Sequence, residues 1–153
     1  MPPKDVDSVD VVVDNSLVER WRELLALHAT TWCELDRRLH EEHALGASDF
    51  EVLDQLAEAC AQRGKPTLRV QELAGSVHLS QSALSRLIGR LEKEGLVQRA
   101  MCCDDRRGVE VLLTEEGRKR CQDARPTHRA VLRRMLDEGG VPACGAEARP
   151  ADA

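Results

Sequence analysis

A segment in the middle of the chain restricts the fold most, because its apolar residues follow first a helical period and then a strand period. Two helical patterns cover about 70–76 and 80–94, and only the short break at 77–79 separates them. Ser80 is placed to cap the second helix, and Gly95 follows that helix at a position where positive φ is tolerated. Two short helices joined by such a tight turn predict a helix-turn-helix.

A hairpin pattern follows the second helix directly. Residues 96–101 and 109–113 have strand character, and the polar loop between them ends in Gly108. A hairpin in this place distinguishes the winged variant from the plain helix-turn-helix. We therefore predict a mainly α fold with a small β-hairpin wing, of the α+β class.

A long amphipathic helix is predicted before this segment, over about 16–43. Asn15 or Ser16 can cap its start, and Gly46 lies just past its end. The apolar stripe consists of Leu17, Trp21, Leu24, Leu25, His28, Trp32, Leu35 and Leu39. A small monomer cannot bury a stripe of this length, so another helix or another subunit must cover it.

The remaining elements have clearer boundaries. Ser48 and Glu51 form a capping-box pattern at the start of a second helix, which ends near residues 63–66. Residues 67–69 form a short extended stretch. A last helix over about 114–137 is capped by Thr114, and the proline at position 126 should bend it or divide it in two.

These elements predict five consecutive parts of the chain. In order they are a flexible acidic arm (1–15), a dimerisation helix (16–47), a winged helix-turn-helix domain (48–113), a C-terminal dimerisation helix (114–138) and a disordered tail (139–153).

The net charge of −5 argues at first against a polyanionic partner. Residues 1–62 hold five basic and fourteen acidic side chains, whereas residues 63–153 hold seventeen basic and thirteen acidic side chains. Salt screens charges beyond roughly 10 Å, so the local field decides whether a surface attracts DNA. The second part can therefore face phosphates while the first part faces water.

The outward face of the predicted helix 80–94 carries short hydrogen-bonding groups and two guanidinium groups. The residues of this face that we expect to contact DNA are Ser80, Gln81, Ser82, Ser85, Arg86 and Arg90. The major groove admits a helix, and arginine can bind guanine there in a bidentate way. An ordinary solvent-exposed helix face is the alternative for this pattern taken alone.

The tip of the predicted hairpin adds a second basic group, formed by Arg106 and Arg107 beside Asp105. Arginine at a narrow loop tip can enter the minor groove, and a neighbouring carboxylate can orient it. A solvated, salt-bridged turn is the alternative here. The helix face and the tip together favour a protein that binds double-stranded DNA.

The sequence resembles the MarR family of bacterial transcriptional regulators over about residues 17–136. The segments that carry the resemblance are 48–53, 79–97, 105–108 and 113–118. Asp105-Arg106-Arg107 matches the family's Asp-x-Arg wing motif, which makes Arg107 the expected minor-groove residue. The resemblance implies a homodimer that binds a pseudo-palindromic operator and represses transcription. It also implies a further C-terminal helix that completes the dimer interface. Here the apolar pattern stops near residue 137. Either the predicted helices 16–43 and 114–137 hold the dimer, or dimerisation is weakened.

The resemblance further implies a signal that releases the DNA, namely a small aromatic or phenolic ligand, cysteine oxidation or, in a few members, a metal. The candidates for a ligand pocket are Trp21, His28, Trp32, Phe50 and Arg69. For Trp21, Trp32 and Phe50 a place in the core is the alternative. The redox candidates are Cys33, Cys102 and Cys103. The histidines are scattered, so we expect no metal site, and nothing points to a cofactor.

Two alternative functions stay open at this point. One is a thiol-based redox-sensing regulator, and the other is a winged-helix protein-interaction module that does not bind DNA. No phosphate-binding loop, catalytic triad or zinc-protease motif points to an enzyme. No apolar run is long enough to span a membrane, and no export signal is recognisable, so we expect a cytoplasmic protein.

Overall fold

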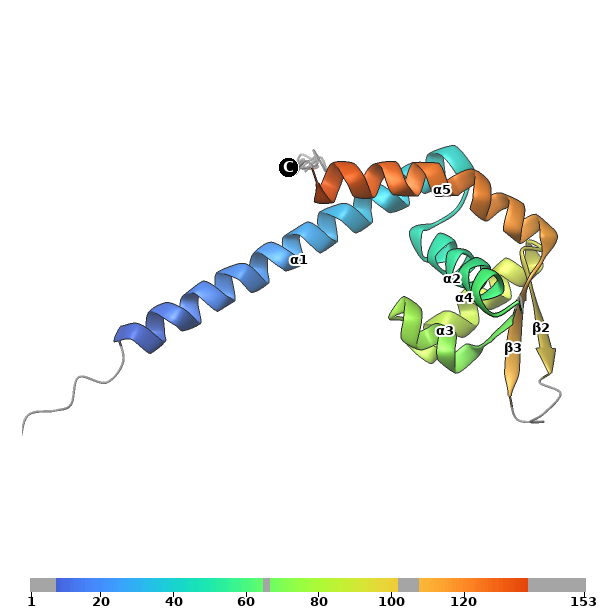
Figure 1. Cartoon of the computed structure of the whole chain (residues 1–153), viewed down its shortest axis with the longest axis horizontal. Coiled ribbons are helices and arrows are strands. Elements are labelled where there is room, and N and C mark those ends of the chain that lie inside the picture. Colours follow the sequence, from blue (N-terminus) through green and yellow to red (C-terminus); the bar gives the residue numbers. More distant parts are fainter. Residues whose placement is uncertain (1–7, 65–66, 102–107, 138–153) are drawn as a thin grey trace, which may run out of the picture.

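Five helices and three short strands make up the part of the chain that the computed structural model describes, residues 8–64, 67–101 and 108–137. In order they are α1 (Ser8–His43), α2 (Ala47–Arg63), β1 (Thr67–Arg69), α3 (Val70–Val77), α4 (Gln81–Lys93), β2 (Val97–Met101), β3 (Val109–Leu113) and α5 (Glu115–Leu136). Figure 1 shows α1 projecting far from a lobe formed by α2, α3, α4 and the sheet, while α5 runs from the lobe along α1. The predicted mainly α fold with a winged helix-turn-helix is confirmed.

The sheet is antiparallel, with strand order β1-β3-β2. Val97 is paired with Leu113 and Met101 with Val109, so β2 and β3 form the predicted hairpin. The short extended stretch before α3 is also a strand, because Thr67 is paired with Leu112 of β3. The third strand ties the start of the helix-turn-helix to the hairpin that follows it.

Helices α3 and α4 form the predicted helix-turn-helix, with bounds close to those expected. His78 adopts a left-handed conformation (φ 53°) that ends α3, and Ser80 Oγ then accepts a hydrogen bond from the Ala83 amide at 3.2 Å. Gly95 has the expected positive φ, 75°. The aliphatic core beneath these helices includes Leu53, Leu56, Leu73, Leu84, Ile88, Leu91, Leu96, Val97 and Val111, each almost or completely buried.

Helix α1 begins at Ser8 rather than at residue 16, so the predicted cap at Asn15 or Ser16 is wrong. No proline or glycine interrupts the chain between Ser8 and Leu45, and the helix therefore continues through the acidic segment. The predicted flexible arm is thus helical over residues 8–15, and its first seven residues lie outside the described part.

The start of α2 also differs from the prediction. The helix begins at Ala47, and the carboxylate of Asp49 accepts a hydrogen bond from the Gly46 amide at 2.9 Å. Asp36 of α1 accepts a second one from the Ala47 amide at 2.8 Å. The expected capping box of Ser48 with residue 51 is wrong, because the helix starts before Ser48 and Asp49 occupies the position that can reach back.

Helix α5 is capped by Thr114, as predicted: Thr114 Oγ1 accepts a hydrogen bond from the Gly117 amide at 3.0 Å. The helix continues without interruption through Pro126, so of the two predicted outcomes the proline bends the helix and does not divide it. Figure 1 shows that α5 changes direction about midway, as expected of a proline kink. Buried Ala124 and His128 hold the helix against its neighbours on either side of the proline.

Among the helices that the structure describes, none combines the length and the apolar character that crossing a membrane requires.

Candidate nucleic-acid interface

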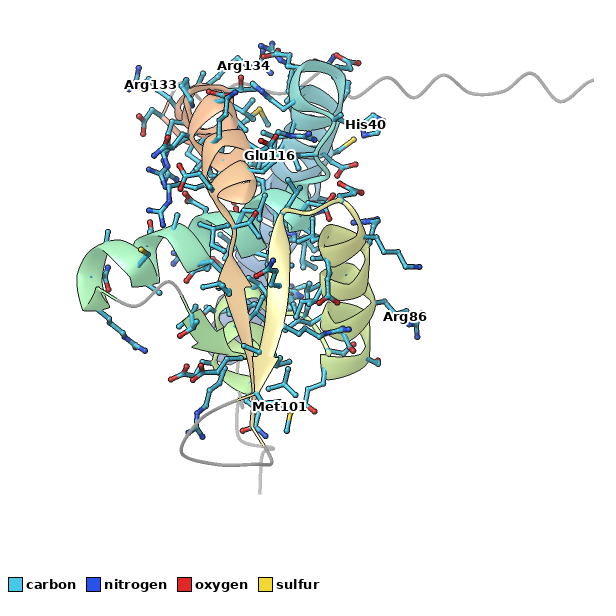
Figure 2. The ribbon with its side chains drawn as sticks, turned by 90° about the vertical axis from the view of Figure 1, so that its right-hand side faces the viewer. His40, Arg86, Met101, Glu116, Arg133 and Arg134 are labelled. Carbon is cyan, nitrogen blue, oxygen red and sulfur yellow. The ribbon has the colours of Figure 1, made fainter. Side chains whose placement is uncertain are left out.

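Helix α4 has one buried and one exposed face. Its buried residues are Leu84, Leu87, Ile88 and Leu91. All six residues predicted to contact DNA at this helix are exposed, namely Ser80, Gln81, Ser82, Ser85, Arg86 and Arg90. Figure 2 shows the side chain of Arg86 extending from α4 away from the lobe. The exposed face therefore offers hydroxyl, amide and guanidinium groups on a rigid helix.

Ser80 has a structural role at the start of this face. Its hydroxyl caps the helix and also lies 3.3 Å from the hydroxyl of Ser82. The first backbone amides of α4 point out of the same end, where a helix attracts anions such as phosphate.

Arg90, at the other end of the face, is paired with Asp49 of α2. The side chain of Asp49 is only 11% exposed, whereas that of Arg90 is 58% exposed. Asp49 also accepts a hydrogen bond from the Gly46 amide, so one carboxylate holds the first turn of α2 and the last turn of α4. Arg90 is thereby held in a defined orientation at the edge of the interface.

Arg99 of β2 belongs to the interface although it was not predicted. Its guanidinium donates to the carbonyl oxygen of Ser85 at 2.8 Å and lies 3.5 Å from Glu92. It passes close to Gly89, where a Cβ atom would be 3.8 Å from it. Arg99 therefore ties the wing to α4. The strand alternation could have indicated this contact, because Arg99 lies on the same face of β2 as buried Val97 and therefore faces the lobe.

A cavity of about 610 Å³ lies between the start of α3, α4 and the sheet. Its lining residues are Arg69, Val70, Gln71, Gln81, Ser85, Ile88, Arg99, Gly108 and Val109. The cavity opens on the same side as the exposed face of α4, and it holds two guanidinium groups together with amide and hydroxyl groups. It is suited to a small molecule that carries an anionic group.

The structure does not bring the five predicted pocket residues together. Of the five, Arg69 lines the cavity beside α4. Trp21 is 59% exposed on the projecting part of α1, and Trp32 is stacked on His28 with ring centroids 6.2 Å apart. Phe50 is fully buried and stacked on His128 at 4.4 Å. Phe50 is a core residue because the α2–α5 interface encloses its ring.

The predicted wing tip, Asp105 to Arg107, and the cysteines Cys102 and Cys103 lie outside the described residues. The strands that lead to the tip end in exposed apolar residues, Met101 and Val109. Figure 2 places Met101 at the end of the sheet that lies farthest from α5.

The described cysteines differ in their surroundings. Cys33 is exposed on α1. Cys121 is fully buried, and this burial, together with the nearby carboxylate of Asp54, raises the pKa of its thiol to about 12. Within residues 8–64, 67–101 and 108–137, no group of three or more His, Cys, Asp or Glu side chains is placed to hold a metal ion.

Comparison with known proteins identifies similar sequences and folds. The MarR family profile matches residues 47–109. AbsC, a MarR family transcriptional regulator from Streptomyces coelicolor, is 32% identical, with 80% of each chain covered and a TM-score of 0.70.

Two further structures are similar. Sco3205, a MarR family regulator of the same organism solved in complex with DNA, is 28% identical over 92% of this chain and 81% of its own, with a TM-score of 0.71. BpsR from Bordetella bronchiseptica, whose DNA binding is regulated by 6-hydroxynicotinic acid, shares the fold at 21% identity, with 81% and 87% covered and a TM-score of 0.64. No curated protein matches the sequence.

Proposed function

The chain belongs to the MarR family of transcriptional regulators, and on that premise we propose that it is a homodimer that binds a pseudo-palindromic operator and represses transcription. The observation that carries the proposal is the exposed face of α4, where Gln81, Ser85 and Arg86 are presented on a helix whose opposite face is buried. The DNA complex of Sco3205 supports it, because that chain is similar over 92% of this one.

The residues of the face have different proposed roles. Gln81, Ser82, Ser85 and Arg86 lie in the major groove, with Arg86 on a guanine. Arg90, held by Asp49 at the edge of the face, contacts a phosphate rather than a base. At the wing tip, Arg107 enters the minor groove with Arg106 beside it and Asp105 as its partner.

A second copy of the chain is the proposed partner of α1. The apolar stripe that is buried at Leu35 and Leu39 continues as exposed side chains toward the N-terminus, at Leu17, Trp21 and Leu24. The projecting part of the helix has the same period, so it can pack on a partner's helices as Leu35 and Leu39 pack within the subunit.

We further propose that a small aromatic anion releases the DNA by binding in the cavity beside α4. Arg69 and Arg99 can hold its anionic group, and Val70 and Ile88 can contact its ring. Because Arg99 ties the wing to the Ser85 carbonyl, a ligand that engages Arg99 would change how the wing is attached to α4.

A mobility-shift titration with duplexes from the protein's own promoter region, across a salt series, tests the function. DNA binding should weaken steeply as salt rises, because phosphate contacts release counterions. No binding below about 100 mM salt would contradict the proposal and favour the protein-interaction alternative.

The base-reading role of Arg86 is tested in the same assay. Arg86→Ala should relax the preference at one base pair of each half-site by about 1–3 kcal/mol, whereas a phosphate contact would lower the affinity uniformly. Arg133→Ala is the matched control, because it removes the same charge from the end of α5 that lies far from the wing in Figure 2.

A further inference from the structure

Helix α5 belongs to two parts of the molecule at once. At its start, Thr114 Oγ1 donates to the carbonyl oxygen of Gly95 at 2.7 Å and so attaches the helix to the lobe. In its last turns Arg134 is paired with Glu34 of α1. The contacts that the middle of α5 makes with α2 therefore set how the lobe is held against the projecting helix.

A buried carboxylate lies in the middle of this contact. Asp54 of α2 is only 5% exposed. Its Oδ1 accepts hydrogen bonds from Arg125 Nε at 3.0 Å and Nη2 at 2.6 Å, and its Oδ2 accepts one from Arg129 Nη2 at 3.1 Å. Two arginines one turn apart on α5 thus hold one carboxylate of α2 through both of its oxygens.

A buried histidine extends the same contact. His128 is stacked on Phe50, and its Nε2 lies 3.0 Å from Glu51 Oε1. Its Nδ1 lies 3.3 Å from Arg129 Nη1. Since arginine can only donate, Nδ1 accepts from Arg129 and Nε2 faces the carboxylate of Glu51 as a donor. Arg129 therefore contacts both Asp54 and His128.

We call this set of residues the α2–α5 joint; it consists of Phe50, Glu51, Asp54, Arg125, His128 and Arg129. Apolar helix packing tolerates small sliding and rotation, whereas a fork of guanidinium groups on one carboxylate fits one relative orientation. A buried carboxylate that loses its partners is strongly destabilised, so intermediate orientations are disfavoured. The joint consequently selects one orientation of α5 on α2.

In the proposed dimer, the orientation of α5 on α2 affects where α4 lies on the DNA. Figure 1 shows α2 between α5 and the pair α3–α4, so a rotation at the joint moves α4 relative to the dimerisation helices. Two such rotations change the separation of the two recognition helices across the dimer axis. One base pair corresponds to a change of about 3.4 Å in this separation. A small rotation at the joint is enough for such a change, because α4 lies at a distance from the joint.

We propose that Asp54 is a positioning residue that fixes the half-site spacing of the operator through the α2–α5 joint. The inference rests on the proposed function, because it presupposes a dimer with one recognition helix in each half-site. Asp54 itself touches no DNA, since it is buried between α2 and α5.

The test begins with duplexes selected by the wild-type protein from a random pool. The half-site separation of the selected operator is then lengthened and shortened by one and two base pairs, and each duplex is titrated by fluorescence anisotropy. Asp54→Asn keeps the shape but removes the charge that both arginines hold. Glu58→Gln, at an exposed position of the same helix, is the matched control.

The wild-type protein and Glu58→Gln should prefer one spacing over its neighbours by at least about tenfold. In Asp54→Asn this ratio should fall by about tenfold, because the neighbouring spacings lose less affinity than the optimal one. An equal loss at every spacing, with the ratio unchanged, would overturn the inference and leave Asp54 a purely structural residue.

If Asp54→Asn does not fold, Arg129→Gln replaces it, because that side chain is 47% exposed and still joins Asp54 to His128. The ratio of affinities between the preferred spacing and its neighbours should fall in the same way, and an unchanged ratio again overturns the inference. If the wild-type protein selects no duplex at all, the proposed function fails and the inference fails with it, which is a different result from an unchanged spacing ratio.

Discussion

At the scale of single residues, Gly117 of α5 lies against the lobe too closely to leave room for a side chain. A Cβ atom there would overlap the backbone carbonyl oxygen of Leu96 and would lie 2.9 Å from Leu113 Cδ1. Gly117→Ala must therefore shift backbone, and we expect it to lower the free energy of unfolding by about 2–3 kcal/mol in urea denaturation.

Gly75→Ala is the control for this substitution. Gly75 lies in α3 with open space around its Cα atom, so alanine should raise the stability by about 0.5–1 kcal/mol through its helix propensity. Equal effects of the two substitutions would show that the Gly117 contact is looser than described.

Capping shows which residue roles were accessible from sequence. Ser80 and Thr114 were predicted correctly as caps, because each is followed directly by a helical pattern and no other Ser, Thr, Asp or Asn stands next to it. At the start of α2 several small or polar residues follow one another. The start is decided there by Asp36, which binds the Ala47 amide from another helix. A contact between residues eleven positions apart is not encoded in a local capping pattern.

The buried thiol of Cys121 should be unreactive in the folded protein. Because burial raises its pKa to about 12, the thiolate fraction at pH 8 is about a thousandfold below that of an ordinary thiol. Labelling with iodoacetamide at pH 8, followed by mass spectrometry, should modify Cys121 only after urea is added. Equal labelling with and without urea would contradict the burial of this thiol.

At the scale of elements, the packing of α5 on α1 combines opposite charges. Glu34 is held by Arg37 and by Arg134 of α5, and these bonds lower its pKa. The hydroxyl of Thr127 and the guanidinium of Arg38 lower the pKa of Glu42. A carboxylate whose pKa is lower in the folded state contributes stability above its unfolded pKa, and this contribution is lost as the pH falls through the folded value.

We therefore expect the urea midpoint of the wild-type protein to fall between about pH 6 and about pH 3, and less so in Glu34→Gln. Glu41→Gln is the matched control, because Glu41 is paired only with Arg37 of its own helix in the described contacts. The idea is refuted if both variants keep the full pH dependence.

The elements themselves were largely predictable, whereas the start of α1 and the contacts between elements were not. The strands and α3, α4 and α5 follow strong apolar periods. The early start of α1 was missed because residues 8–14 have no clear amphipathic pattern, although nothing in them breaks a helix. The contact of Arg99 with the carbonyl of Ser85 depends on how the sheet turns toward α4, which a residue pattern does not specify.

At the scale of the whole molecule, the residues predicted to line one pocket belong to two separate surfaces of the structure. The predicted pocket combined residues of α1 with Arg69, but Trp21 lies on the projecting helix while Arg69 lines the cavity beside α4. Aromatic residues on one helical face predict burial without stating the partner. This separation supports the proposals that the stripe of α1 is a dimer surface and that the cavity beside α4 binds the effector.

The dimer proposal makes a prediction about α1 that can be tested without DNA. Leu24 is 60% exposed within the stripe, so Leu24→Ser removes apolar area from both copies of the interface at once. Losing about 1.5 kcal/mol in each copy should raise the dimer dissociation constant about a hundredfold. Sedimentation equilibrium over a concentration series measures it.

Leu27→Ser is the matched control, because Leu27 is also exposed (38%) but lies roughly 100° around the helix from the middle of the stripe. Its dissociation constant should change much less than that of Leu24→Ser. The two variants should keep the same far-ultraviolet circular dichroism, since neither side chain belongs to the core of the subunit. If both substitutions weaken the dimer equally, the interface is wider than the stripe, and if neither does, a second copy of the chain is not what covers α1.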